Sequence, residues 1–391
     1  MRILVLSFYF RPDLSAGSFR ATALVEALRQ QMPADGRIDV LTTLPNRYSS
    51  FTVEAPAEES IDGVTVTRIP LPAHKSGMID QAKAFISYAR AVLKHTRGQQ
   101  YDLVFATSGR LMSAVLAAWI SRNKKIPLYL DIRDIFVDTI KDVLPKHFSL
   151  LIKLVFSPLE RWAVGSATRV NLVSRGFAAY FEPRYPGKVF SYFTNGIDDE
   201  FLDLPVSENT ASKSGPVQVV YAGNLGEGQG LHAIIPQLAA AMRGHATFKI
   251  IGDGGRKEAL KAALEHSGVD NVELVPPVKR QQLIEAYSQA DVLFLHLNDY
   301  EAFKKVLPSK LFEYGAMGKP IWAGVSGYAA EFIAKELDNA AVFPPCDVDA
   351  AVRSFDQLEI RANARTGFME KFSRKNLVRQ MAAEILALRT R

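Results

Sequence analysis

Short apolar runs alternate with longer amphipathic stretches along this chain. Residues 18–31 carry apolar side chains at helical spacing, and runs typical of buried strands occupy 2–6, 37–41, 103–106, 128–130 and 170–173. Strand, helix and strand in this order predict a parallel sheet covered by helices. After a polar stretch at 207–215, the pattern restarts with runs at 217–221, 248–251, 272–275 and 292–295. The sequence therefore predicts an α/β protein with two doubly wound domains, joined near residues 196–215.

The length supports the same division. A chain of 391 residues is too long for one typical core and matches two domains of roughly 150 to 200 residues each. We expect a first domain over 1–200 and a second over 201–372, with a cleft between them. The last segment, 373–391, has apolar residues at helical spacing, and we expect this helix to cross back to the first domain.

Composition excludes several classes of protein. No stretch reaches the roughly 18 uninterrupted apolar residues of a membrane span, and Met1–Ser7 has no cleavage site after it. The single cysteine, Cys346, excludes a disulfide framework and a multi-cysteine metal site. These features predict a soluble protein of the reducing cytoplasm.

The net charge of +6 is unevenly distributed. Residues 1–200 carry 25 Lys and Arg against 19 Asp and Glu, residues 201–360 carry 14 against 20, and residues 361–391 carry 8 against 2. One face is therefore expected to be basic while the middle of the chain is acidic. A basic face suits nucleic acid, or else an anionic membrane surface or a phosphate-bearing substrate.

The segment after the first apolar run is a candidate anion site, because ligands of open α/β sheets bind beyond the carboxyl ends of the strands. In Tyr9–Arg20, Gly17 lies where a helix begins and Ser18 is expected to cap that helix. Free amides and the positive helix end would suit an anion. An ordinary strand-to-helix turn fits the same residues.

Two glycine-rich segments follow strands of the second domain. Their candidate residues for a phosphate ligand are Gly223, Asn224, Gly252, Asp253 and Arg256. Glycine allows a ligand to approach the backbone, and an arginine can neutralise a phosphate. The glycines at 226, 228 and 230 lack the G-x-G-x-x-G spacing of a nicotinamide dehydrogenase, and the Walker pattern is absent too.

The densest set of candidate residues lies in Lys304–Pro320. Pro308 and Ser309 predict a helix start, which would direct free amides and the ammonium of Lys310 at a diphosphate. Glu313, one turn later, would accept hydrogen bonds from ribose hydroxyls. A capped amphipathic helix with solvated lysines fits the same residues.

Together, these motifs resemble glycosyltransferase family 4. The resemblance rests on Gly223–Gly226, Gly252–Gly254 and above all on Pro308–Tyr314 followed by Gly318–Pro320. In the first half, further markers are Phe10–Pro12 with Gly17, and Thr194–Asp198, so that nearly the whole chain is covered. The resemblance is greatest to the branch that builds bacterial surface polysaccharides, such as the N-acetylfucosamine transferases.

The resemblance implies the GT-B fold, in which two Rossmann-like domains face each other across a cleft. It also implies residue roles. Glu313 would bind the donor ribose, Ser309 and Lys310 would contact the donor phosphates, and the backbone near Val278 would read the nucleobase. Gly17 would let the leaving diphosphate approach the first domain.

Three positions depart from the family pattern. The first glutamate of its paired-glutamate motif is Lys305 here, and the basic pair of the first loop of the second domain is replaced by Asn224 and Gln229. Arg256 and Lys310 would then supply most of the positive charge for the diphosphate. The identity of the donor sugar stays open.

Charged residues also end a strand of the first domain, at Asp131–Asp134. The resemblance places Asp134 near the acceptor hydroxyl, with Arg133 before it, whereas a structural ion pair is the alternative interpretation. Family members retain anomeric configuration, and the donor phosphate accepts the acceptor proton. A lone carboxylate therefore needs only to orient or assist.

We predict no metal ion and no cofactor besides the donor substrate. Asp347–Asp349 has the Asp-x-Asp spacing of a metal motif, but a helical pattern follows it, which favours helix capping. The histidines lack a ligand spacing such as H-E-x-x-H, and Cys346 is interpreted as a packing residue.

Two helical stretches, Met78–Gln99 and Pro145–Trp162, combine basic and apolar residues. The first stretch carries Lys83, Arg90 and Lys94. Such helices would lie on anionic lipid, or would instead pack their apolar faces on the sheet. The acceptors of the family are often lipid-linked, which favours a peripheral membrane protein.

The sequence thus predicts a retaining, metal-independent glycosyltransferase. Its donor would be a UDP-sugar, such as an N-acetylated or deoxy hexose, and its acceptor a polyprenyl-diphosphate-linked glycan of a lipopolysaccharide or capsule. We expect it on the cytoplasmic face of the inner membrane, without a nucleic-acid partner. Two alternatives stay open: a nucleotide-sugar epimerase of the same fold, which needs no acceptor, and a non-catalytic nucleotide-binding scaffold subunit.

Overall fold

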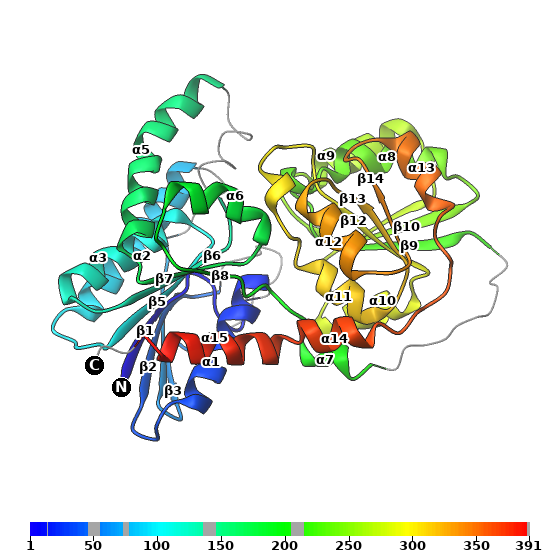
Figure 1. Cartoon of the computed structure of the whole chain (residues 1–391). Helices are drawn as coiled ribbons and strands as arrows, with labels where there is room; N and C mark the ends of the chain where they lie inside the picture. The colour runs from blue at the N-terminus through cyan, green and yellow to red at the C-terminus, as the bar shows by residue number, and fades with distance from the viewer. Residues whose placement is uncertain (14, 46–54, 73–77, 136–145, 205–214, 389–391) are drawn as a thin grey trace. The chain divides into compact units, whose positions relative to one another are not determined.

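In a computed structural model, the chain forms two compact units (Figure 1). Unit 1 comprises Met1–Asn195 with Arg374–Arg391, and unit 2 comprises Gly196–Ser373. The structure describes residues 1–13, 15–45, 55–72, 78–135, 146–204 and 215–388, without the side chains of 78–79 and 146–153.

Unit 1 is an eight-stranded sheet in the order β3-β4-β2-β1-β5-β6-β7-β8, with helices on both faces (Figure 1). The strands are β1 (Arg2–Leu6), β2 (Arg37–Thr43), β3 (Glu58–Ile61), β4 (Val64–Ile69), β5 (Leu103–Ser108), β6 (Leu128–Ile132), β7 (Arg169–Leu172) and β8 (Phe190–Ser191). The helices are α1 (Ala16–Gln31), α2 (Met78–Thr96), α3 (Leu111–Lys124), α5 (Lys146–Ser166), α6 (Ala178–Phe181) and α15 (Arg374–Leu386).

Unit 2 is a six-stranded parallel sheet in the order β11-β10-β9-β12-β13-β14. The strands are β9 (Val217–Asn224), β10 (Ala246–Asp253), β11 (Val272–Val275), β12 (Val292–His296), β13 (Ile321–Gly324) and β14 (Ala340–Phe343). The helices are α7 (Asp199–Leu202), α8 (Leu231–Ala241), α9 (Lys257–Ser267), α10 (Arg280–Gln289), α11 (Lys310–Met317), α12 (Tyr328–Glu336), α13 (Val348–Phe355) and α14 (Thr366–Phe372).

This topology confirms the predicted fold class. If the strands are numbered within unit 2 alone, their order in the sheet is that of doubly wound nucleotide-binding domains. In such domains the first strand lies at the centre of the sheet. Each predicted apolar run forms a strand, because strands covered on both faces must be apolar throughout. All residues of β5, β6 and β12 are buried.

The edge of unit 1 differs from the prediction, because it carries an unpredicted hairpin of β3 and β4. The two strands pair antiparallel through a two-residue turn, in which Asp62 and Gly63 both have positive φ, 49° and 74°. A turn of two left-handed residues matches the twist of antiparallel strands. β3 is largely exposed and polar, so it lacks the apolar pattern that revealed the central strands.

The chain leaves unit 1 after Asn195 and returns to it at Arg374. On the unit 2 side, the amide of Ile197 donates to the carbonyl of Phe372 at 2.7 Å. On the unit 1 side, Arg374 Nη1 donates to the carbonyl of Asn195 at 2.8 Å. The two crossing segments are therefore hydrogen-bonded to each other. Of the predicted linker, residues 205–214 lie outside the described part of the chain.

After this return, α15 lies along α1 (Figure 1). Val378, Met381 and Ile385 are buried in the same cluster as the apolar face of α1. Glu384 also accepts a hydrogen bond from Tyr129 Oη, at 2.8 Å, which ties α15 to the sheet of unit 1.

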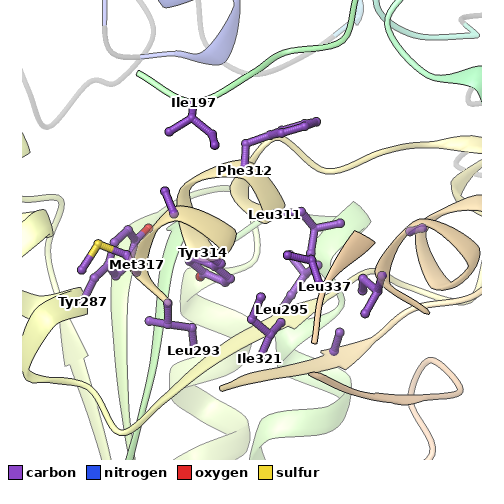
Figure 2. Packing of buried hydrophobic residues seen from close by; sticks show 14 of the residues in the cluster. Ile197, Tyr287, Leu293, Leu295, Leu311, Phe312, Tyr314, Met317, Ile321 and Leu337 are labelled. Atoms are coloured by element: carbon purple, nitrogen blue, oxygen red, sulfur yellow. The ribbon is translucent and has the colours of Figure 1, made fainter. Parts of the chain in front are cut away.

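Helix α11 of unit 2 is held by its apolar side (Figure 2). Leu311, Phe312, Tyr314 and Met317 are buried in one cluster with Leu293, Leu295 and Ile321 of the sheet and with Ile197 of the crossing segment. Lys310 and Glu313 lie on the partly exposed side of the same helix. Packing of α11 thus fixes the position of two predicted site residues.

Candidate active site

The strand order of unit 2 reverses between β9 and β12, so a ligand is expected beyond the carboxyl ends of these strands. Several predicted donor-binding residues gather at this edge. Gly223 and Asn224 at the end of β9 pair in register with Gly252 and Asp253 at the end of β10. The side chain of Lys310 lies over Gly223.

Glycine is required at both strand ends. Gly223 and Gly252 have φ of 147° and 154°, which other residues rarely adopt. A Cβ atom on Gly252 would stand 1.9 Å from the carbonyl oxygen of Gly223, and one on Gly223 would stand 2.3 Å from Lys310 Nζ. Gly223 therefore leaves bare backbone beneath the ammonium of Lys310, and Gly252 allows β10 to pack closely against it.

Lys310 is the first residue of α11 and Ser309 is its N-cap residue, so the helix starts as predicted. Lys310 Nζ lies 3.4 Å from Tyr221 Oη and 4.8 Å from the centre of the Tyr221 ring. Burial lowers the pKa of Lys310 to about 8, although the charge of Glu313 opposes this shift. An ammonium at a helix N-terminus is suited to a phosphate group.

The two neutral residues that replace the family's basic pair bind each other. Asn224 Nδ2 donates to Gln229 Oε1 at 2.8 Å, and the amide of Gly226 donates to the same oxygen at 3.3 Å. The loop after β9 is thus closed by its own side chains. Positive charge at this edge must come from elsewhere in the unit.

Arg256 is already engaged within the protein. Its Nε donates to the carboxylate of Glu227, which also accepts a hydrogen bond from Tyr300 Oη at 2.6 Å. The bond from Tyr300, assisted by Arg256, lowers the pKa of Glu227. The charge of Arg256 is therefore partly offset by Glu227, which the sequence did not predict.

Glu313 is held by two neighbours. Arg280 Nη1 donates to Glu313 Oε1 at 3.0 Å, and Tyr287 Oη donates to Oε2 at 3.4 Å. Val278 lies just before Arg280, in the segment between β11 and α10, and is partly buried against the core. Lys305 ends the short 3-10 turn Phe303–Lys305 and is partly exposed.

In unit 1, the strand order reverses between β1 and β5, and α1 begins after β1. Ser15 caps this helix by accepting a hydrogen bond from the amide of Ser18 at 3.2 Å. The prediction that Ser18 is the cap was therefore wrong. The helix starts earlier than its apolar pattern, and the Ser18 side chain is buried.

Gly17 and Arg133, both predicted site residues, lie together. A Cβ atom on Gly17 would stand 2.1 Å from Arg133 Nη1. Burial lowers the pKa of Arg133, and Arg133 Nε has no hydrogen-bond partner among the described residues. A desolvated guanidinium at the first turn of α1 is suited to an anionic group.

The charged residues at the end of β6 have different surroundings. Asp131 is buried and bound by Arg20, with both distances at 2.9 Å, and Asn171 Nδ2 donates to Asp131 at 2.8 Å. Asp131 and Arg20 thus form a buried ion pair that the sequence did not predict. Asp134 is exposed at the end of this segment.

Sequence reasoning missed three polar residues of these sites: Arg20, Arg280 and His296. His296 is fully buried at the end of β12. Its Nδ1 lies 2.7 Å from the carbonyl of Gln229, and its Nε2 accepts the amide of Cys346 at 3.0 Å. Burial lowers the pKa of His296 to about 4, so the neutral ring joins the loop after β9 to the loop before α13. Nothing in the sequence around His296 signals these contacts.

The Asp-x-Asp spacing at Asp347–Asp349 is explained by helix capping. Asp347 caps α13 by accepting a hydrogen bond from the amide of Ala350 at 2.8 Å, as predicted. Within the described parts of the chain, no group of three His, Cys, Asp or Glu side chains gathers in a way that could hold a metal ion.

Two family models match the chain. The model of the glycosyl transferases group 1 matches residues 206–373, and the model of the glycosyl transferase 4-like domain matches residues 17–189. Each match falls on one of the two units. The chain thus belongs to the glycosyltransferases of the GT-B fold, with one matched domain in each half. No curated protein matches the chain.

Solved structures with the same fold include several glycosyltransferases. Sucrose-phosphate synthase from Thermosynechococcus elongatus is 14% identical, with a TM-score of 0.72 and 99% of each chain covered. HepE of Anabaena with bound UDP and glucose is 18% identical, with a TM-score of 0.67 and 99% of each chain covered. WaaG, a glycosyltransferase involved in lipopolysaccharide biosynthesis, is 14% identical, with a TM-score of 0.64. The match covers 97% of this chain and 95% of the WaaG chain.

Proposed function

We propose that this glycosyltransferase transfers a sugar from a UDP-linked donor to a hydroxyl of a polyprenyl-diphosphate-linked glycan, in the synthesis of a cell-surface polysaccharide. The transfer would retain anomeric configuration and need no metal ion. HepE structures contain UDP and UDP-glucose, and WaaG acts in lipopolysaccharide biosynthesis, which supports this donor and this setting.

One arrangement carries the proposal. Lys310 lies at the N-terminus of α11 above the bare backbone of Gly223, and Glu313 follows one turn later. An ammonium and helix amides suit the diphosphate of a nucleotide, and a carboxylate suits the ribose hydroxyls.

Unit 1 would serve the acceptor and the leaving group. Asp134 is proposed to orient the acceptor hydroxyl, and Arg133 with the first turn of α1 near Gly17 is proposed to stabilise negative charge on the leaving diphosphate. The departing phosphate oxygen would take the proton of the acceptor hydroxyl as the new glycosidic bond forms. Such preorganised cations stabilise developing charge in a transition state.

The donor part is tested by calorimetry with a panel of nucleotides and nucleotide sugars, first without metal and then with Mg²⁺. We expect UDP to bind without metal, and Glu313→Ala and Lys310→Ala to weaken binding by roughly ten- to hundredfold each. Product formation with and without a lipid-linked acceptor then separates a transferase from an epimerase. No binding of any nucleotide to the folded protein would favour the scaffold alternative.

We also propose that the basic unit 1 rests on anionic lipid through α5 and α3. Leu154, Val155 and Trp162 of α5 and Trp119 of α3 are exposed apolar side chains, with exposed fractions between 36% and 65%. Arg161 and Trp162 border a surface hollow of about 310 Å³ next to Pro158. α3 packs on α5, so these residues belong to neighbouring helices. Large exposed apolar side chains beside arginine are typical of membrane-surface helices.

The other predicted membrane helix, α2, fits less well. Phe85 and Tyr88 are buried in unit 1, and only Ile86 of its large apolar residues is strongly exposed among those described. The side chains at 146–153, at the start of α5, lie outside the described residues. Within the described parts of the chain, no helix has the length and apolar character needed to cross a membrane.

Flotation with phosphatidylglycerol liposomes tests the surface. Leu154→Ser with Trp162→Ser should abolish flotation, because these side chains supply the buried apolar area. Lys83→Glu with Arg90→Glu and Lys94→Glu on α2 is the matched control and should reduce flotation only modestly through charge. Full flotation of the α5 variant would contradict the proposal.

A further inference from the structure

Arg280 is the centre of a cluster of three carboxylates in unit 2. Its Nη1 donates to Glu313, its Nη2 to Asp198 and its Nε to Glu200, at 3.0, 2.7 and 2.7 Å. The guanidinium also lies 4.4 Å from the centre of the Phe201 ring. The charges of Glu313 and Asp198 and the bond to Glu200 raise the pKa of Arg280, despite an opposing effect of burial.

Asp198 is placed to hold this guanidinium rather than a helix. It is the N-cap residue of α7, but its side chain makes no capping bond within the described structure. The carboxylate is directed at Arg280 instead. Asp198 directly follows Ile197 of the crossing segment, whose backbone is fixed by the bond to Phe372. Because a guanidinium is planar, the bond from Nη2 to Asp198 also fixes the direction in which Nη1 points.

Glu313 depends on that direction. A carboxylate accepts about four hydrogen bonds, two on each oxygen. Arg280 and Tyr287 take one site on each oxygen of Glu313. Two sites remain, one on each oxygen, and their orientation is set by the two donors. A ribose offers two neighbouring hydroxyls, which matches this remaining capacity.

We propose that Arg280 is a positioning residue, which orients the carboxylate of Glu313 for the two hydroxyls of the donor ribose and is itself held by Asp198. The inference rests on the proposed function, because it takes a nucleoside diphosphate as the ligand. Arg280 touches no ligand atom in this assignment. Its whole contribution to donor affinity passes through the bonds between Glu313 and the ribose.

A double-mutant cycle, in which one change is made in the protein and the other in the ligand, isolates that contribution. Affinities for UDP and for 2′,3′-dideoxyuridine diphosphate are measured by calorimetry on the wild-type protein, Glu313→Ala and Arg280→Gln. We expect Arg280→Gln to weaken UDP binding about tenfold, since a hydrogen bond to a charged group is lost or misdirected. The same variant should bind the dideoxy analogue within about twofold of wild type, because there are no hydroxyls to misplace.

Two further variants grade the effect. Asp198→Asn removes one charge that holds the guanidinium and should weaken UDP binding by a smaller factor, again without affecting the dideoxy analogue. Glu200→Gln is the matched control, because Glu200 binds the same guanidinium but is 59% exposed, and it should leave both affinities unchanged. Arg280→Lys keeps the positive charge but loses the planar set of donors, and it replaces Arg280→Gln if that variant fails to fold.

The outcomes separate this inference from the proposed function. If Arg280→Gln, or Arg280→Lys in its place, weakens both ligands equally, Arg280 only supports the structure and the inference fails. Unchanged binding of both ligands by that variant also overturns it. If the wild-type protein does not bind UDP, or if Glu313→Ala binds it normally, the proposed donor site fails and the inference falls with it.

Discussion

The ammonium of Lys310 occupies the space that a side chain on Gly223 would need, since a Cβ atom there would stand 2.3 Å from Nζ and 2.4 Å from Cε. Gly223, near the end of β9, and Lys310, the first residue of α11, are therefore in direct contact, although 87 positions separate them in the sequence. Their contact places the main predicted phosphate cation over the half-buried backbone of Gly223. Adding a single methyl group at Gly223 therefore tests the proposed donor site.

Gly223→Ala should push the ammonium of Lys310 off the backbone. Because φ at this position is 147°, the alanine is also strained. We expect UDP binding to weaken by about tenfold, together with a loss of stability of roughly 1 to 3 kcal/mol. Calorimetry and thermal melting check both effects.

The control for this substitution is Gly255→Ala, in the neighbouring glycine-rich turn. A Cβ atom on Gly255 meets no atom within 4 Å, so this variant should bind and melt like the wild type. Equal UDP affinity of Gly223→Ala and Gly255→Ala would show that Lys310 does not need its present position.

The lowered pKa of Lys310, about 8, predicts that donor binding depends on pH. The free protein loses the proton of Lys310 as pH rises through 8, and a diphosphate then has to bind together with a proton. UDP affinity should be constant below pH 7 and fall by up to roughly tenfold per unit above pH 8. Calorimetry from pH 6.5 to 9 measures this slope.

Lys310→Arg separates the lysine from other titrating groups, including those of UDP itself. A guanidinium stays charged throughout this range, so the variant should bind UDP with a flatter pH profile even if its affinity at pH 7 is lower. A wild-type slope in Lys310→Arg would assign the pH dependence to another group.

The sequence predicted the central strands because they are buried on both faces and therefore apolar throughout, as in β5 and β12. It did not predict β3, which is polar and exposed, or the four-residue strands β13 and β14. Half of the residues of β13 and β14 are Ala or Gly, which are depleted in strands, whereas the equally short β7 and β11 carry Val and Leu and were predicted.

The candidate site likewise contains residues that the sequence revealed and residues that it did not. The glycines and Lys310 could be found because each follows a strand or begins a helix in the sequence itself. The partners of Arg256 and Arg280 could not, because Glu227 and Glu313 lie 29 and 33 positions away and approach only after the loops fold. Free charge was therefore overestimated at Arg256, and the support of Glu313 was missed.

Asp131 and Asp134 are expected to affect different properties. Asp131→Ala leaves the buried guanidinium of Arg20 without its carboxylate and should lower the free energy of unfolding by about 3 to 5 kcal/mol. Asp134 is exposed, so Asp134→Ala should change stability by no more than about 0.5 kcal/mol while lowering kcat by roughly a hundredfold. Denaturant unfolding and turnover on a lipid-linked acceptor measure the two effects. Normal turnover by Asp134→Ala would remove that residue from the site.

His296 should make unit 2 less stable in acid. Its folded pKa is about 4, below the ordinary value of 6.5, so the unfolded chain binds a proton between these values and the folded chain does not. Stability is therefore lost as pH falls through 6.5, by about 2 kcal/mol between pH 7 and pH 5. A protonated ring would also set a second N–H against the amide of Cys346, which now donates to Nε2.

His296→Asn tests this assignment, because its amide nitrogen can replace Nδ1 as donor to Gln229 but does not titrate. The variant should be less stable at pH 7, since the amide of Cys346 loses its acceptor, yet its stability should fall less steeply toward pH 5. Denaturant unfolding is followed by tryptophan fluorescence in a background of Trp119→Phe and Trp162→Phe. Only Trp322, which is buried in unit 2, then reports on unfolding. Parallel pH profiles of the two proteins would mean that other groups, and not His296, set the acid limit of unit 2.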